Sequence, residues 1–255
     1  MGYAIEFQDV TKTFRGAGRP AADHVDFAAD EGEFITILGS SGCGKTTLLK
    51  MVNRLYEPDS GKITLFGTDI STMDVVKVRR RIGYVIQQIG LFPHFTVGEN
   101  IAIVPRLLKW EKEKVDARVE ELLELIGLEP EEYKNRYPAQ LSGGQQQRVG
   151  LARALAADPK ILLMDEPFGA IDSITRIKLQ DELLGLHRGM EKTVLFVTHD
   201  IEEALKMGTR VMIMNEGKIV QFDVPENIIR NPADGFVKSL VESAKAKEQF
   251  WERFQ

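Results

Sequence analysis

Gly39-Ser40-Ser41-Gly42-Cys43-Gly44-Lys45-Thr46 matches the pattern G-x-x-x-x-G-K-[ST] at every fixed position. The continuous apolar run from Phe34 to Leu38 precedes it and predicts a strand that is covered on both faces. Apolar residues at helical spacing follow it between Lys45 and Leu55. Strand, glycine-rich loop and helix is the order that this motif requires, so the sequence predicts a polyphosphate site.

The chemistry of the loop follows from its residue types. Glycines let successive backbone N–H groups turn toward phosphate oxygens, and the next helix adds its positive amino end. Lys45 is predicted to contact the β- and γ-phosphates, and the Thr46 hydroxyl to bind Mg²⁺. The spacing does not fit the dinucleotide pattern G-x-G-x-x-G. The predicted nucleotide contacts here are Gly39, Ser40, Ser41, Gly42, Cys43, Gly44, Lys45, Thr46 and Thr47.

A second apolar run, Ile161 to Met164, ends in two carboxylates, Asp165 and Glu166. A buried strand that ends in Asp presents this group to the Mg²⁺ beside nucleotide phosphates. Glu166 is predicted to accept a proton from the attacking water, as a general base. The alternative is a strand that leaves for solvent through a polar turn, and the upstream phosphate loop favours the catalytic interpretation.

The rest of the chain alternates between apolar runs and helical patterns, which is typical of a parallel α/β sheet. The first third is rich in predicted strands, and the stretch from Val97 to about Leu128 is helical, with a break expected at Pro105. Further helices are expected over Gly143 to Ala157, near 173–189 and 200–207, and from about Pro232 onward, with strands at Thr193 to Val197 and Arg210 to Met214.

Composition restricts the function classes. The 255 residues carry a formal net charge of 33 − 38 = −5, which argues against a general nucleic-acid binder. No apolar run approaches the roughly 18 residues of a membrane helix. Glu6 and Asp9 do not suit a signal peptide. The single cysteine, Cys43, excludes an internal disulfide and fits a reducing cytosol.

Leu141-Ser142-Gly143-Gly144-Gln145-Gln146-Gln147-Arg148 resembles the signature sequence of ATP-binding cassette (ABC) ATPases. The resemblance implies that Ser142, Gly143, Gly144 and Gln145 face the γ-phosphate bound by a partner subunit. Two chains would then enclose two ATP molecules head to tail, in a two-fold arrangement. Ser142 is at the same time a predicted helix N-cap, and the two interpretations are compatible.

Four further residues match the family's pattern one by one. Gln87 resembles the Q-loop glutamine, a contact of Mg²⁺ and water, and His199 the switch histidine at the γ-phosphate. Asp172 resembles the D-loop aspartate, although Gly169 stands where the family usually has serine. Phe14 stands where a tyrosine often stacks on adenine; its alternative is a core residue.

The resemblance also implies the architecture. We expect an α/β fold of the P-loop NTPase (RecA-like) type, with an antiparallel β subdomain and an inserted helical subdomain. The whole chain, 1–255, would form one ABC ATPase domain. Its predicted parts are the nucleotide-binding core with β subdomain (1–89 and 159–230), the helical subdomain (90–158) and a helical tail (231–255).

Two stretches of sequence point to a particular group within this family. Ile82 to His94 and Asp165 to Asp172 are similar to the ATPase subunit of bacterial osmoprotectant importers, which move betaine, choline or carnitine. Some of those subunits carry CBS modules after the ATPase, for which a chain ending at Gln255 leaves no room. An importer of another small solute, such as a polar amino acid, is the alternative.

Two other function classes do not account for all the motifs and their spacing. A small-molecule P-loop kinase does not need Ser142 to Gln147 or His199. DNA-repair ATPases of the same superfamily place a long coiled coil between the phosphate loop and the signature. Lys45 and Ser142 are only 142 − 45 = 97 residues apart, which is too few.

The implied partners are a second ATPase subunit, identical or closely related, and integral membrane permease subunits, with a substrate-binding protein acting indirectly. The chain would sit peripherally on the cytoplasmic face of the membrane, with no nucleic-acid partner. The apolar stretch Ile89 to Phe95 directly follows Gln87. We therefore predict that Leu91, Phe92 and Phe95 dock a coupling helix of the permease; alternatively, they complete the core of the helical subdomain.

Overall fold

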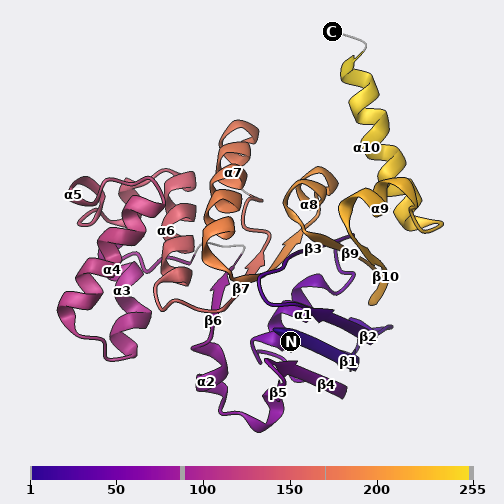
Figure 1. Cartoon of the computed structure of the whole chain (residues 1–255), viewed down its shortest axis with the longest axis horizontal. Coiled ribbons are helices and arrows are strands. Elements are labelled where there is room, and N and C mark those ends of the chain that lie inside the picture. The colour runs from indigo at the N-terminus through magenta and orange to yellow at the C-terminus, as the bar shows by residue number, and fades with distance from the viewer. Residues whose placement is uncertain (1, 87–89, 170, 253–255) are drawn as a thin grey trace. The chain divides into compact units, whose positions relative to one another are not determined.

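The computed structural model describes residues 2–86, 90–169 and 171–252. The chain forms two compact units, Met1–Val75 with Thr193–Gln255, and Val76–Lys192 (Figure 1). The first unit contains the predicted phosphate loop, and the second contains the acidic strand end and the signature sequence. The predicted division into 90–158 and the remainder stays a prediction.

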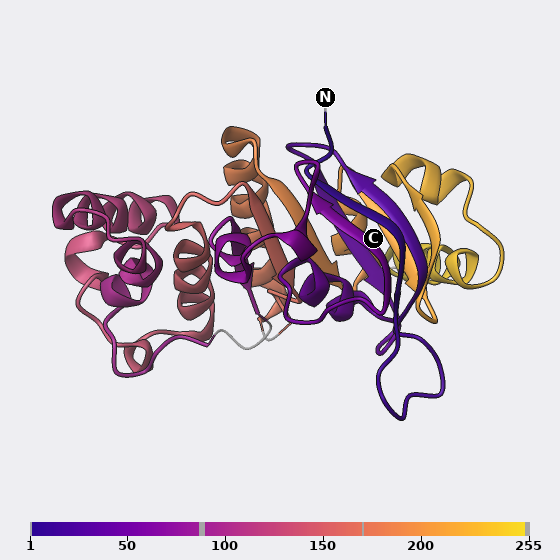
Figure 2. The ribbon, with the colours of Figure 1, turned by 90° about the horizontal axis from the view of Figure 1, so that it is seen from below.

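An antiparallel sheet in the first unit has the strand order β2-β1-β4-β5. The bounds are β1 Ile5–Lys12, β2 Ala22–Ala29, β4 Ser60–Leu65 and β5 Thr68–Asp69. Phe7 pairs with Phe27 across β1 and β2, and their rings stack with centroids 4.6 Å apart. The connection between β1 and β2 extends beyond the sheet (Figure 2).

A second sheet in this unit runs β10-β9-β3-β8. The bounds are β3 Phe34–Gly39, β8 Thr193–Thr198, β9 Arg210–Asn215 and β10 Lys218–Asp223. β3 pairs in parallel with both β8 and β9, and all six residues of β3 are buried. A parallel strand with both faces covered favours such a predominantly apolar run, so this expectation is confirmed. The one polar side chain, Thr36, donates to the Ala204 carbonyl at 3.0 Å.

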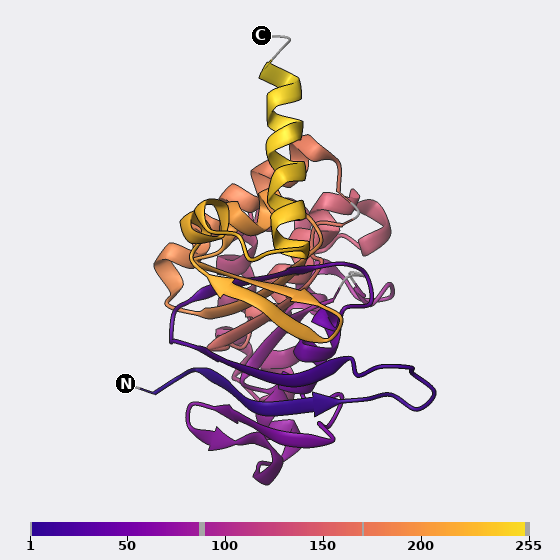
Figure 3. The same cartoon turned by 90° about the vertical axis from the view of Figure 1, so that its right-hand side faces the viewer.

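Helices cover this second sheet. They are α1 Lys45–Val52, α8 Ile201–Met207, α9 Pro225–Arg230 and α10 Phe236–Glu252. The short 3₁₀ helix η1 Ile70–Thr72 contacts β4 of the antiparallel sheet instead. Ile228 of α9 and Val237 and Val241 of α10 are buried in one apolar cluster with Val211 and Ile213 of β9. The far end of α10 extends away from the sheet (Figure 3).

The second unit combines parallel strands with helices. β6 Ile82–Val85 pairs with β7 Ile161–Asp165. The helices are α2 Val75–Arg79, α3 Val97–Leu107, α4 Lys112–Leu125, α5 Pro130–Tyr133, α6 Gly143–Leu155 and α7 Ser173–Met190, with the 3₁₀ helix η2 Pro138–Gln140. α3, α4 and α6 pack on one another. None of the helices in the described part of the chain has the length and hydropathy of a membrane span.

Some local expectations were wrong. α3 runs through Pro105 and ends at Leu107, and the break falls later, at Lys109, whose φ is 58°. Pro105 lies in the last turn of α3, where it removes one backbone hydrogen bond and the helix is about to end anyway. β10 and α9 were not predicted. Glu216 and Gly217, both with positive φ, form the tight β9–β10 turn that could have revealed the hairpin.

Candidate nucleotide-binding site

The phosphate loop connects the carboxyl end of β3 to the start of α1. Gly42 and Gly44 adopt φ values of 76° and 111°, which favour glycine. A Cβ atom at Gly44 would overlap the carbonyl oxygen of Ala21, and one at Gly39 would overlap that of Met214. The glycines of the motif are therefore required by the backbone path and by the close approach of neighbouring segments.

The surface of the loop is open, and its base is fixed. Ser40, Ser41 and Gly42 are exposed, whereas Cys43 and Gly44 are buried. The Gly217 N–H donates to the carbonyl of Cys43 at 3.0 Å, which ties the loop to the β9–β10 turn. Because the N-cap of α1 is Gly44, no side chain caps the first N–H groups of the helix. These donors are suited to an anion.

Lys45 lies within the loop and is only 5% exposed. Its ammonium group donates to the carbonyl oxygens of Gly39 at 2.7 Å and Ser40 at 3.0 Å. The Cys43 sulfur lies 4.0 Å from the same nitrogen. The Lys45 ammonium group therefore lies inside the loop, at the place where phosphate oxygens are predicted. Thr46 and Thr47, in the first turn of α1, are half-buried.

His199 directly follows β8 and is exposed. Leu38 pairs with Thr198, so the parallel register brings His199 to the same sheet edge as Gly39. Phe14 lies at the start of the β1–β2 connection, half-buried, with its ring 5.0 Å from that of Tyr56 in an edge-to-face contact. The first unit thus gathers the loop and the predicted γ-phosphate contact at one edge.

The acidic residues end β7 in the second unit. Asp165 is 7% exposed at the last position of the strand. Glu166 follows with a φ of 46°, the left-handed conformation, and is half-buried. A non-glycine residue in this region of φ/ψ space is uncommon and clusters at functional sites. The strand therefore ends abruptly and presents the two carboxylates in succession.

The signature sequence forms the start of α6. Ser142 is the N-cap: its Oγ accepts from the Gln145 N–H at 3.3 Å, and Gln145 Oε1 accepts from the Ser142 N–H at 2.9 Å. The Gln145 amide also donates to the Tyr133 hydroxyl at 3.1 Å. Gln145 is thus engaged within its own chain, while Ser142 and Gly143 are exposed.

Asp172 is the N-cap of the neighbouring helix α7. Its carboxylate accepts from the Thr175 N–H at 3.0 Å, and this bond, with a second from the Thr175 side chain, lowers the pKa of Asp172. A Cβ atom at Gly144 would lie 3.2 Å from Cγ2 of Thr175. The second unit therefore places the starts of α6 and α7 side by side. Gln87, the remaining predicted contact, lies outside the described residues.

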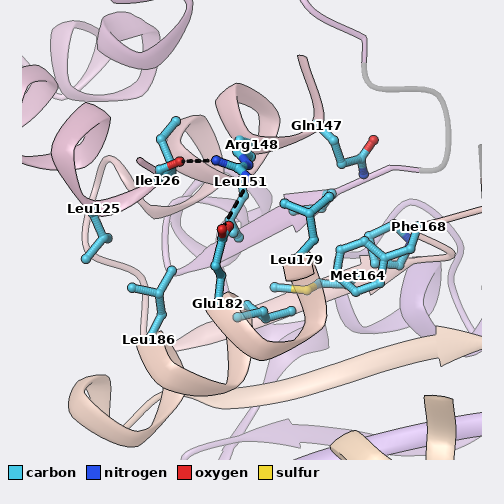
Figure 4. A pocket seen from close by; sticks show the side chains of 13 residues that line it. Leu125, Ile126, Gln147, Arg148, Leu151, Met164, Phe168, Leu179, Glu182 and Leu186 are labelled. Atoms are coloured by element: carbon cyan, nitrogen blue, oxygen red, sulfur yellow. Dashed lines mark hydrogen bonds and ion pairs between the residues drawn. The ribbon is translucent and has the colours of Figure 1, made fainter. Parts of the chain in front are cut away.

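An apolar cavity of about 30 Å³ lies elsewhere in the second unit, between α6, α7 and the end of α4 (Figure 4). Leu125, Leu151 and Leu179 line it, and an ion pair between Arg148 and Glu182, 3.1 Å long, borders it. This volume accommodates a water molecule rather than a nucleotide. The cavity is therefore not part of the predicted phosphate site.

Sequence reasoning missed two polar residues of the second unit, the buried Asn100 and the half-buried Arg153. Asn100 is fully buried and bonds to the backbone of Phe92, Phe95 and Thr96. Arg153 donates to the carbonyl of Gly90 at 2.7 Å. A polar residue inside an amphipathic helix carries no local signal that reveals its partners.

A glycine-rich turn between a buried parallel strand and a helix, with a buried lysine at the helix start, defines a nucleotide-binding domain of the P-loop class. The profile of the ABC transporter family matches residues 22–169, more than half of the chain. The chain belongs to this family.

Relatives and solved structures agree with this assignment. The carnitine transport ATP-binding protein OpuCA of Listeria monocytogenes is 54% identical over 93% of this chain and 59% of its own length. The glycine betaine/carnitine/choline transport ATP-binding protein OpuCA of Bacillus subtilis is 53% identical over 93% of this chain and 62% of its own length. The chain thus spans about three fifths of these curated relatives.

The fold is that of solved cassettes. The dimeric ATP-binding cassette MJ0796, bound to ADP and Pi, superposes with a TM-score of 0.77 at 37% identity, covering 87% of this chain and 98% of that chain. The expected architecture, a mixed α/β cassette with an antiparallel and a parallel sheet, is confirmed.

Proposed function

We propose that the chain binds and hydrolyses ATP and thereby powers an ABC importer for quaternary-amine osmoprotectants. The observation that carries the proposal is the phosphate loop with buried Lys45, at one sheet edge with His199. The named substrates of the similar relatives, carnitine, betaine and choline, support the solute class.

Each predicted residue has a role in this mechanism. The α1 amino end and Lys45 bind the β- and γ-phosphates, replacing the loop carbonyls that now hold the ammonium group. Glu166 accepts a proton from the attacking water, and His199 contacts the γ-phosphate. Phe14 stacks on adenine, with a gain of about 1–3 kcal/mol by analogy with base stacking.

Magnesium fits the donor set. Thr46 offers a hydroxyl and Asp165 a carboxylate at the end of a buried strand, and such oxygen ligands suit this hard cation. We propose Thr46, Asp165 and Gln87 as its contacts. When bound, the ion neutralises charge on the phosphates.

A second subunit completes each site. Ser142, Gly143, Gly144 and Gln145 face the nucleotide held by the partner, with Asp172 beside them. The open surface at Ser142 and Gly143 and the dimeric state of the similar cassette MJ0796 support this arrangement. A Glu166→Gln variant should bind ATP and accumulate as a dimer, measured by size-exclusion chromatography with ATP. Hydrolysis at the normal rate would refute the base assignment.

In this proposal the solute crosses the membrane through separate permease subunits, and the chain binds them peripherally at the cytoplasmic face. Phe92 and Phe95 are 49% and 43% exposed, with their rings 5.5 Å apart, and Leu91 is half-buried. We propose that these three residues dock a short helix of the permease. A Phe92→Asp variant should lose co-purification with the permease while the isolated subunit hydrolyses ATP normally. Retained co-purification and transport would contradict this docking role.

The solute class is tested with the assembled transporter and its binding protein in liposomes. Glycine betaine, choline and carnitine should each be tried for stimulation of ATP hydrolysis, alongside a polar amino acid such as glutamine. Stimulation by a quaternary amine supports the proposal. Stimulation by glutamine alone would assign the chain to an importer of another solute.

A further inference from the structure

The loop that presents Phe92 and Phe95 is held from below by Asn100 of α3. Asn100 is 0% exposed, and its Oδ1 accepts from the Phe92 N–H at 2.8 Å. Its Nδ2 donates to the carbonyls of Phe92, Phe95 and Thr96 at 3.2, 3.1 and 2.9 Å. One buried amide thus fixes the backbone on both sides of the two exposed rings. Because its partners are backbone groups, this loop shape does not depend on which side chains it displays.

A second helix holds the other end of the same loop. Arg153 of α6 donates from Nη1 to the carbonyl of Gly90 at 2.7 Å. Its guanidinium carbon lies 6.0 Å from the centroid of the Phe92 ring, within the range of a cation–π contact. A charged hydrogen bond to a carbonyl is stronger than a neutral one, so this contact ties α6 to the loop firmly.

Arg153 lies in the last turn of α6, and Ser142 is the N-cap of the same helix. They are 153 − 142 = 11 residues apart, which is about 16 Å at the rise of an α-helix. Between them, Arg148 anchors the helix to the carbonyl of Ile126 at 3.2 Å and to Glu182 of α7 (Figure 4). Val149, Ala152 and Leu155 are buried on its inner face. A packed helix of this kind moves as a body rather than bending.

We propose that Arg153 is a positioning residue that passes movement of the Ser142 end of α6 to the Phe92–Phe95 loop. α6 then acts as a lever with the nucleotide-facing N-cap at one end and the permease-facing loop at the other. Asn100 keeps the loop rigid, so that the displacement reaches the exposed rings. This inference rests on the proposed docking of the permease at Phe92.

The test measures solute moved per ATP hydrolysed by the assembled transporter in liposomes, with labelled glycine betaine. Arg153→Met keeps the long side chain beside Phe92 but cannot donate to Gly90. We expect the ratio to fall at least fivefold, while ATP hydrolysis by the isolated subunit stays within twofold of wild type. Arg153→Lys restores a donor and should recover at least half of the ratio. A merely structural residue would not separate transport from hydrolysis in this way.

Arg148→Gln is the matched control. It removes an arginine from the same helix that also donates to a backbone carbonyl but does not contact the loop. Its ratio should stay at the wild-type value, whatever happens to its melting temperature. An unchanged ratio in Arg153→Met, or equal losses of ratio in Arg153→Met and Arg148→Gln, would overturn the lever. If Arg153→Met does not fold, Arg153→Gln replaces it under the same criteria.

The Phe92→Asp variant separates the two proposals. If it loses transport while Arg153→Met keeps the normal ratio, docking stands and the lever is wrong. If Phe92→Asp co-purifies and transports normally, the docking surface itself is wrong, and the lever fails with it.

Discussion

The helices α1 and α6 both begin in glycine-rich turns that we assign to phosphate, but their first turns are built differently. α1 starts at Gly44, in the left-handed region, without a side chain that caps it. α6 starts at Ser142 in ordinary extended geometry, with a complete capping box formed with Gln145. An N-cap side chain therefore engages the first turn of α6, whereas the first turn of α1 has no such side chain.

The glycines differ in the same way. Gly44 is needed for the fold, because its φ and the nearby Ala21 carbonyl exclude a side chain. Gly143 has open space around its Cβ position, so its own chain does not require glycine there. A small residue at an exposed helix start lets another group approach closely. We infer that the approaching group comes from outside the chain, as in the two-subunit site that we propose.

The largest expected effect is the difference in ATP hydrolysis between variants of the two lysines of α1, Lys45 and Lys50. Lys45→Ala removes the buried ammonium group of the loop, and ATP hydrolysis should fall by about 10²-fold or more, because a preorganised charge at the phosphates is lost. Lys50→Ala is the control. Lys50 lies on the same helix, with its ammonium group over the Tyr56 ring at 5.3 Å, and its loss should change hydrolysis less than twofold. Equal rates of ATP hydrolysis in the two variants would mean that Lys45 does not act at the phosphates.

The second effect is on stability. Gly44→Ala forces a side chain into the left-handed region against a backbone carbonyl, and should cost at least about 2 kcal/mol of unfolding free energy. Gly143→Ala adds a methyl group in open space and should stay within about 0.5 kcal/mol of wild type. Urea denaturation of both variants measures the difference. Comparable losses would mean that the α6 start is as constrained as the phosphate loop.

The sequence predicted the parts of the fold that depend on local order. The strand and helix on either side of the phosphate loop lie where the motif places them, at Phe34–Gly39 and Lys45–Val52. The break after α3 was misplaced, because the effect of Pro105 depends on its position within the turn. Asn100 and Arg153 were missed because their partners are backbone groups four to 63 residues away, and hydrophobic periodicity does not encode such partners.

A smaller effect tests whether Ser142 does more than cap α6. Ser142→Ala removes the cap and should cost about 1 kcal/mol, whereas Ser142→Asp caps as well as serine and should keep the stability. The aspartate also places a negative charge where we propose a partner's γ-phosphate. We therefore expect Ser142→Asp to keep its unfolding free energy but lose about tenfold in ATP hydrolysis by the dimer. If its hydrolysis equals that of wild type, Ser142 is only a cap.

The smallest expected effect is on the pH dependence of stability, and it concerns the N-cap of α7. Asp172 caps it as Ser142 caps α6, but it carries a charge at the positive helix end. Hydrogen bonds from Thr175 lower its pKa below the ordinary 3.8, so the charged form stabilises the folded state. That stabilisation is present at neutral pH and is lost as the pH falls through the lowered pKa.

Asp172→Asn keeps a capping oxygen without the charge. Wild type should be more stable than Asp172→Asn at pH 7, and the difference in unfolding free energy should shrink toward zero in acid. The other carboxyl groups are the same in both proteins, so their contributions cancel in this difference. A difference that is independent of pH would show that the hydrogen bond alone, and not the charge, stabilises the start of α7.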